Sequence, residues 1–300
     1  MCGFKDFAGA EYQKQNPMTY GILKVATCQF AVGDDIRRNA LQIQRFLHKA
    51  KKAGADIVHF PESAASGYVG ADFPNFEEFN WQMLKEEAEK IMALAKELHL
   101  WVVLGSSHRL TPPNKPHNSL YLISPDGKIV DRYDKRFCTK GDLKYYTPGN
   151  HFVNFTINGV KCSMLICFDL RFPELYRQLC KQDVNCIFQS FYNARQKTPT
   201  VHKYIMRQTM QCHAATNHFW ISMVNASGYY CPYGSCFIVP DGRISRRLKA
   251  NCAGMMVNTV NINEKFYDPS AHFRKMAIAG ALGNGPKVIN DPRSKNTKIL

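Results

Sequence analysis

The sequence contains no apolar run that approaches the ~20 residues needed to cross a lipid bilayer. Its first residues, MCGFKDFAGAEYQKQNPMTYG, lack a basic segment followed by an apolar one, so we expect no signal peptide. Both absences weigh against membrane insertion and secretion. We therefore expect a cytoplasmic protein with no membrane partner.

Regular cysteine spacing is missing as well. The 11 cysteines are an odd number and do not form the even, closely spaced set of a secreted disulfide framework. Cys231 and Cys236 flank a PYGS segment, but no second Cys or His pair follows at the spacing of zinc ligands. The sequence thus predicts free thiols in a reducing compartment and no metal site.

Negative charge is comparatively scarce. The chain has 39 Lys and Arg against 24 Asp and Glu, a net charge of +15 that attracts anions, nucleic acids among them. The basic residues are dispersed, however, and the run SRRLK at 245–249 has no interleaved aromatic side chains to stack on bases. We interpret the charge as solvated surface, with nucleic-acid binding as the less favoured alternative.

The apolar residues alternate between strand-like runs and runs with helical spacing. In 36–50, for example, Ile36, Ala40, Ile43 and Leu47 fall on one helix face. The predicted strands are 23–30, 55–60, 101–107, 119–124, 128–133, 152–157, 160–166, 185–191, 219–225, 235–240 and 243–248, and the predicted helices are 36–50, 76–99, 173–181 and 200–217. This alternation predicts an α/β fold built in layers.

Turn signals join several of these runs. Pro-Asp-Gly at 125–127 and 240–242 and Asn-Gly at 158–159 are typical of hairpins. No linker separates the runs, so we expect one domain over 21–283, preceded by a flexible arm (1–20) and followed by a tail (284–300).

The segment LICFDLRFPE (165–174) places Cys167 where an apolar strand ends and a helix begins. Ligands bind at such strand ends in open α/β sheets, and the backbone N–H groups of the turn can hold an oxyanion. Packing remains an alternative for Cys167, because the chain has many cysteines. A reactive thiol also needs a group that accepts its proton or stabilises its charge.

Two charged residues at other strand ends are candidates for that group. Glu62 follows the strand of IVHFPE, and Lys135 ends the strand of VDRYDK. A carboxylate can take the thiol proton, and a lysine can stabilise a tetrahedral oxyanion. Alternatively, Glu62 is a helix cap or surface acid and Lys135 one of many lysines.

Together these motifs resemble those of the nitrilase, or carbon–nitrogen hydrolase, superfamily, in its amidase branch. Cys-Phe-Asp-Leu-Arg-Phe-Pro-Glu (167–174) resembles the nucleophile motif, Phe-Pro-Glu (60–62) the base motif and Tyr-Asp-Lys (133–135) the lysine motif. Softer matches are Val25, Ala26, Gln29, Asn118, Thr147, Pro148, Gly149, Ala214, Asn217 and Asn225, so the resemblance runs from about 24 to about 262.

The resemblance implies a four-layer α-β-β-α sandwich, a homodimer or higher homo-oligomer, and no metal or organic cofactor. It implies that Glu62 is the general base, that Cys167 is the nucleophile, and that Lys135 and the Phe168 N–H stabilise the oxyanion. The family's second glutamate corresponds to Asp142, a shorter acid that we expect to orient Lys135 or substrate.

The loop after the strand 185–191 lines the substrate pocket in the family. By resemblance, Tyr192, Asn193 and Arg195 are candidate substrate-binding residues, and Arg195 is either a clamp for a substrate carboxylate or a solvated surface residue. Tyr68 is a candidate pocket wall, with the apolar core as its alternative. Arg171 and Glu174 are expected to form an ion pair beside Cys167.

The motifs and the resemblance together imply a cysteine-dependent hydrolase that cleaves a small linear amide or N-carbamoyl compound through a thioester and releases ammonia. The alternatives are a non-catalytic binding module of the same fold, an acyl or carbamoyl transferase, and a nitrile hydrolase.

Overall fold

The structure, a computed structural model, describes residues 20–196, 200–286 and 288–298. The chain divides into two compact units, Met1–Tyr267 and Asp268–Leu300. The predicted arm lies outside the described residues except for Tyr20, and the predicted domain end at residue 283 falls inside the second unit.

Two six-stranded sheets form the centre of the first unit. The order in the first sheet is β12 (Gly254–Asn261), β1 (Ile22–Gln29), β2 (Ile57–His59), β3 (Trp101–His108), β4 (His117–Ile123) and β5 (Ile129–Asp134). The order in the second is β11 (Ile244–Arg247), β10 (Cys236–Ile238), β9 (Trp220–Asn225), β8 (Cys186–Phe191), β7 (Val160–Ile166) and β6 (Asn154–Ile157). Each sheet has three parallel strands at its centre, β1–β2–β3 and β7–β8–β9, and antiparallel strands at its edges.

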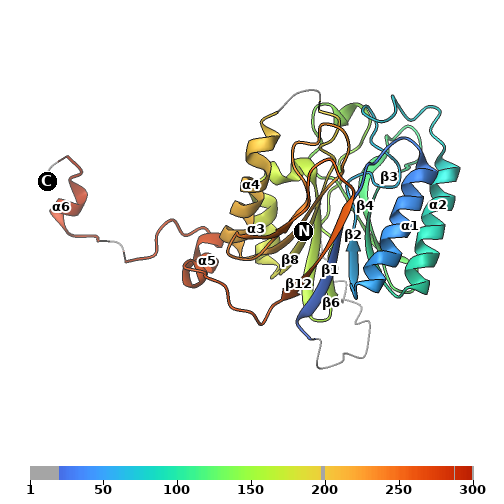
Figure 1. Ribbon diagram of the computed structural model, residues 1–300. Helices are drawn as coiled ribbons and strands as arrows, with labels where there is room; N and C mark the ends of the chain where they lie inside the picture. The colour runs from blue at the N-terminus through green and yellow to red at the C-terminus, as the bar shows by residue number, and fades with distance from the viewer. Residues whose placement is uncertain (1–19, 197–199, 287, 299–300) are drawn as a thin grey trace. The chain divides into compact units, whose positions relative to one another are not determined.

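Helices cover the outer face of each sheet (Figure 1). The first sheet carries α1 (Ile36–Lys52) and α2 (Trp81–Glu97), and the second carries α3 (Pro173–Lys181) and α4 (His202–Asn217). Apolar side chains from both sheets, such as Val25 and Met164, share one core between them. The predicted α-β-β-α sandwich is therefore confirmed.

Local chemistry explains where the elements begin. Asp35 caps α1 by accepting from the Arg38 N–H at 3.0 Å. The predicted helix 76–99 begins only at Trp81, because Asn80 caps it through the Met83 N–H at 2.9 Å. At the Asn-Gly turn, Asn158 and Gly159 have φ values of 51° and 79°, as a tight hairpin between β6 and β7 requires.

The second unit contains α5 (Ala271–Ile278) and α6 (Pro292–Lys295), and α5 has no buried residue. In the described part of the chain, every helix is too short or too polar to traverse a bilayer.

A small polar cluster interrupts the apolar core between the sheets. It consists of Thr27, His59, Ser190 and Ser222, all fully buried. The His59 ring contacts Ser222 Oγ through Nδ1 and Ser190 Oγ through Nε2, both at 2.8 Å, and Thr27 Oγ1 lies 2.8 Å from Ser222 Oγ. Burial lowers the pKa of His59 to about 3, so the folded protein keeps this imidazole neutral.

We predict that His59 makes the protein less stable on the acid side. Between pH 6.5 and 3 the unfolded chain binds a proton at His59 and the folded chain does not, so stability falls as the pH falls through this window. The loss should reach about 2 kcal/mol at pH 5. Urea unfolding at pH 7 and pH 5 measures this loss of stability. The His59→Gln variant should lack the part of the loss that is due to His59. The control variant His48→Gln, on the exposed face of α1, should lose as much stability as the wild type. An equal acid loss in wild type and His59→Gln would contradict the prediction.

Candidate active site

Cys167 lies on the sharp turn between β7 and the 3-10 helix η2 (Cys167–Arg171). Its φ of 41° is in the left-handed region, which a non-glycine residue occupies only when its surroundings impose it. Asp169 does so: its carboxylate accepts from the Ile166 N–H at 2.9 Å, the Phe137 N–H at 2.9 Å and the Tyr133 hydroxyl at 2.8 Å. Burial raises the pKa of Asp169 to about 6, although these hydrogen bonds stabilise the charged carboxylate and act in the opposite direction.

Glu62 is fully buried and lies just after β2 of the first sheet, whereas Cys167 follows β7 of the second. Its Oε1 accepts from Asn118 Nδ2 at 2.8 Å and from Lys135 Nζ at 2.9 Å, and its Oε2 accepts from the Tyr192 N–H at 2.8 Å. Three donors therefore fix the carboxylate in one orientation.

Lys135 follows β5 and is 1% exposed. Its Nζ donates to Glu62 Oε1 and, at 2.8 Å, to Asp142 Oδ2. Burial works against the ammonium charge, but the negative charge of Glu62 and its neighbours outweighs it and raises the pKa of Lys135 well above its usual value. Lys135 is thus a permanent cation held between two carboxylates.

Asp142, at the start of the 3-10 helix η1 (Asp142–Lys144), reaches Lys135 although its side chain is shorter than the glutamate that the family motif has at this position. It also accepts from the Tyr68 hydroxyl at 2.5 Å and from the Thr139 N–H at 2.9 Å. Burial alone would raise the pKa of Asp142, but the charge and hydrogen bond of Lys135 hold it below its usual value. The turn at 139–142, closed by hydrogen bonds between Thr139 and Asp142, places this acid within hydrogen-bonding distance of Lys135.

The Cys167 thiol belongs to the same electrostatic cluster. Burial, and then the negative charge of Glu62, raise its pKa well above the usual value, although Lys135 acts in the opposite direction. The thiol is therefore protonated at neutral pH, and its reaction as a nucleophile requires a base that takes the proton.

A cavity of about 240 Å³ opens onto this thiol. Its lining residues are Tyr68, Ala71, Lys135, Thr139, Cys167, Phe168, Leu170, Arg171, Tyr192, Asn193, Ala194, Gln196, His202 and Met206. The rings of Tyr68 and Tyr192 stack at 4.7 Å to form one wall, and Asn193 Nδ2 lies 3.9 Å from the Cys167 sulfur. The structure thus gathers the predicted residues Tyr68, Lys135, Cys167, Phe168, Tyr192 and Asn193 around one space, with Glu62 and Asp142 in contact with Lys135.

Arg195 is not among these lining residues. Its Nε pairs with Asp72 Oδ1 at 2.8 Å, and Asp72 also accepts from the Tyr192 hydroxyl at 2.7 Å and the Tyr68 N–H at 2.8 Å. Arg195 therefore supports the tyrosine wall from outside. The expected ion pair between Arg171 and Glu174 does not form among the described residues, and Arg171 lines the cavity instead.

Sequence reasoning gave no role to Asp169 or Asp72. Asp169 left a signal, because a charged residue on the turn that follows the apolar end of β7 must find partners when that turn is buried. Asp72 left none, since it lies in an irregular loop whose path the sequence does not specify.

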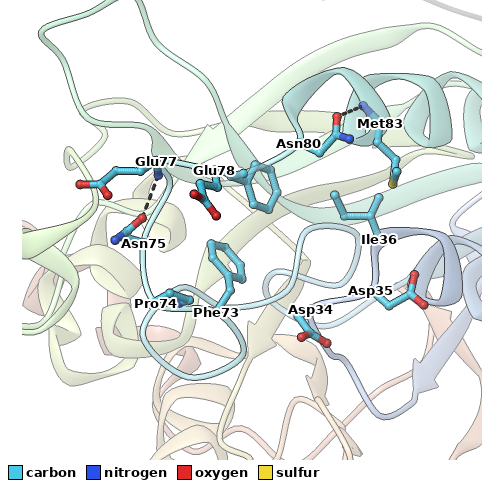
Figure 2. A pocket seen from close by; sticks show the side chains of 11 residues that line it. Asp34, Asp35, Ile36, Phe73, Pro74, Asn75, Glu77, Glu78, Asn80 and Met83 are labelled. Carbon is cyan, nitrogen blue, oxygen red and sulfur yellow. Dashed lines mark hydrogen bonds between the residues drawn. The ribbon is translucent and has the colours of Figure 1, made fainter.

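A second cavity, of about 410 Å³, is larger but has different chemistry (Figure 2). Its lining residues include four acidic ones, Asp34, Asp35, Glu77 and Glu78, together with Phe73, Pro74 and Met83. Its lining residues include neither a thiol nor a lysine, and Asp35 and Asn80 serve as helix caps. We therefore assign the chemistry to the smaller cavity.

Comparisons with known proteins agree with this geometry. The carbon-nitrogen hydrolase family matches residues 24–264. The 2-oxoglutaramate amidase of Bacillus subtilis is 29% identical over 154 residues, which are 51% of this chain and 58% of that protein. The formamidase of Helicobacter acinonychis is 30% identical over 216 residues, or 68% of this chain and 62% of that protein. The matched regions thus span less than two thirds of either relative.

Solved structures show the same fold. A variant of an amidase of the nitrilase superfamily from Nesterenkonia AN1 superposes with a TM-score of 0.70 at 18% identity, covering 80% of this chain and 91% of that one. Because the family match spans most of the chain and includes Glu62, Lys135 and Cys167, the protein belongs to the carbon–nitrogen hydrolase family.

Proposed function

We propose that this protein is an amidase-type hydrolase that cleaves the C–N bond of a small linear amide or N-carbamoyl compound. The observation that carries the proposal is the contact between Glu62 and Lys135 beside the Cys167 thiol, where Lys135 and Cys167 line one cavity. A base, a cation and a nucleophile in this arrangement suit acyl transfer.

In this mechanism Glu62 takes the thiol proton while Cys167 Sγ attacks the amide carbon. Lys135 Nζ and the Phe168 N–H stabilise the oxyanion, and the proton held by Glu62 passes to the nitrogen, which leaves as ammonia. A water molecule, deprotonated by Glu62, then attacks the thioester carbon and releases the acid and the thiol. Asp142 keeps Lys135 oriented throughout.

We infer that the substrate carries an anionic group away from its amide. Arg171 lines the cavity and has no ion-pair partner among the described residues, and none of the lining side chains is a carboxylate. An arginine at that place suits a carboxylate. The name of the Bacillus relative, 2-oxoglutaramate amidase, agrees with an anionic amide.

The location proposed is a reducing, cytoplasmic one. Its support is that every cysteine among the described residues is a free thiol.

A substrate panel tests the function. Purified protein is incubated with simple amides, ω-amides of dicarboxylic acids, N-carbamoyl amino acids and nitriles, and ammonia release is recorded beside the intact mass of the acid-quenched protein. We expect the ω-amides to release ammonia fastest and to add one acyl group to the enzyme. Absence of release from every class would contradict the hydrolase and favour a binding module. If the enzyme-bound acyl group were transferred to hydroxylamine faster than to water, a transferase would be favoured.

A further inference from the structure

The candidate active site is divided between the two sheets. Glu62 and Lys135 follow strands β2 and β5 of the first sheet, whereas Cys167 follows β7 of the second. Their alignment therefore depends on how one sheet is placed over the other. Apolar side chains fill most of that interface, and apolar contacts alone are not directional.

The polar cluster in this interface is directional. Ser190 Oγ donates to the Phe60 carbonyl at 3.0 Å, so its lone pairs are left to accept from His59 Nε2–H. His59 Nδ1 then carries no proton and accepts from the Ser222 hydroxyl, which in turn accepts from Thr27. Each group therefore donates to the next in a single direction. Thr27 of the first sheet donates to Ser222 of the second, and Ser222 donates to His59 of the first. His59 then donates to Ser190 of the second sheet, which donates to the Phe60 carbonyl.

The end of this chain of hydrogen bonds is next to the candidate base. Phe60, which accepts from Ser190, is two residues before Glu62. Ser190 is itself two residues before Tyr192, whose N–H donates to Glu62 Oε2 at 2.8 Å. The end of β2 is thus tied to β8 at two successive points, one through its backbone and one through the Glu62 carboxylate.

We propose that His59 and Ser190 are positioning residues that hold Glu62 against the second sheet and so keep its carboxylate aligned with the Cys167 thiol. The proposal rests on the proposed function for the role of Glu62. Ser222, on the other side of the imidazole, contacts only the ring and Thr27 through its hydroxyl. It reaches β2 only through the His59 side chain, whereas Ser190 also binds the backbone that leads to Glu62.

This difference gives a matched pair of variants. Ser190→Ala and Ser222→Ala each remove one fully buried hydroxyl and two hydrogen bonds, one of them to His59. Their urea unfolding midpoints should therefore fall by similar amounts. With the best substrate of the panel, we expect Ser190→Ala to lower kcat on the order of tenfold with KM unchanged, because small misplacements of a catalytic group are costly. Ser222→Ala should stay within about twofold of wild type.

A second readout does not need a substrate. The rate at which iodoacetamide alkylates Cys167 is followed against pH, by peptide mass spectrometry because the chain has 11 cysteines. The charge of Glu62 raises the thiol pKa, so Glu62→Gln should move the profile to lower pH. The size of that shift is the reference for the two serine variants. Ser190→Ala should move it in the same direction, and Ser222→Ala should leave it in place.

The outcomes separate the two hypotheses. Equal losses of kcat and equal pH profiles in the two serine variants would make the cluster purely structural and overturn the positioning role. An unchanged profile in Glu62→Gln would instead remove Glu62 from the mechanism, and the proposed function with it.

Discussion

Replacement of Cys167 by alanine should abolish ammonia release from every substrate that the wild-type protein hydrolyses. In the proposed mechanism the thioester forms on the Cys167 sulfur, and none of the other side chains that line the cavity is a thiol. Loss of a nucleophile that acts together with its base costs on the order of 10⁶ in kcat. The measurement is ammonia release under saturating substrate, with the intact mass showing no acyl adduct.

The matched control for this variant is Cys138→Ala. Cys138 lies three residues from Lys135 and is partly buried, but it does not line the cavity, and burial raises the pKa of its thiol to about 12. Its replacement should leave turnover near the wild-type level. Release that persists in Cys167→Ala, or that disappears in Cys138→Ala, would place the nucleophile elsewhere.

Replacement of Lys135 by methionine should have the largest effect on stability. It leaves Glu62 and Asp142 buried, at 0% and 5% exposure, without the cation between them. Removal of one partner from a buried ionic group costs about 3–5 kcal/mol, because the remaining charge is uncompensated. Urea unfolding measures the loss, and turnover should disappear with it because the oxyanion loses its cation.

Two further variants test the cause. Lys90→Met breaks the 2.7 Å pair with Glu87 on α2, where the lysine side chain is 61% exposed, and it should cost less than about 1 kcal/mol. Asp142→Asn, added to Lys135→Met, removes one of the unpaired charges and should recover part of the stability. A Lys135→Met protein as stable as Lys90→Met would show that the buried cluster does not depend on its cation.

The sequence predicted the layers well because strand and helix periodicities are local. Lys135 and Cys167 could be found because each follows a recognisable strand, and the Asn-Gly and Pro-Asp-Gly turns marked the hairpins. Helix α2 begins at Trp81, five residues later than the predicted start at 76. Phe76, Phe79 and Trp81 pack against one another as an aromatic cluster, and the residues before the Asn80 cap are not helical.

Contacts between distant loops could not be predicted in the same way. Arg195 was a candidate for binding substrate, but the loop before α2 brings Asp72 against it. Likewise, no periodicity indicates that β2 and β8 face each other across the core at His59 and Ser190. A histidine within the apolar run ADIVHF was the one visible sign, since a buried imidazole needs partners for both nitrogens.

The division of the site between two sheets also bears on the chain while it is being made. Strand β12, near residue 260, pairs with β1 over eight residues and completes the first sheet. Glu62 and Lys135 leave the ribosome before Cys167, but the sheet that carries them lacks this edge strand until synthesis has passed it. A chain that stops before β12 therefore lacks one edge of the sheet whose strands precede Glu62 and Lys135. The base, the cation and the thiol therefore come together only when both sheets are complete and packed, so the geometry behind the proposed function belongs to the whole sandwich.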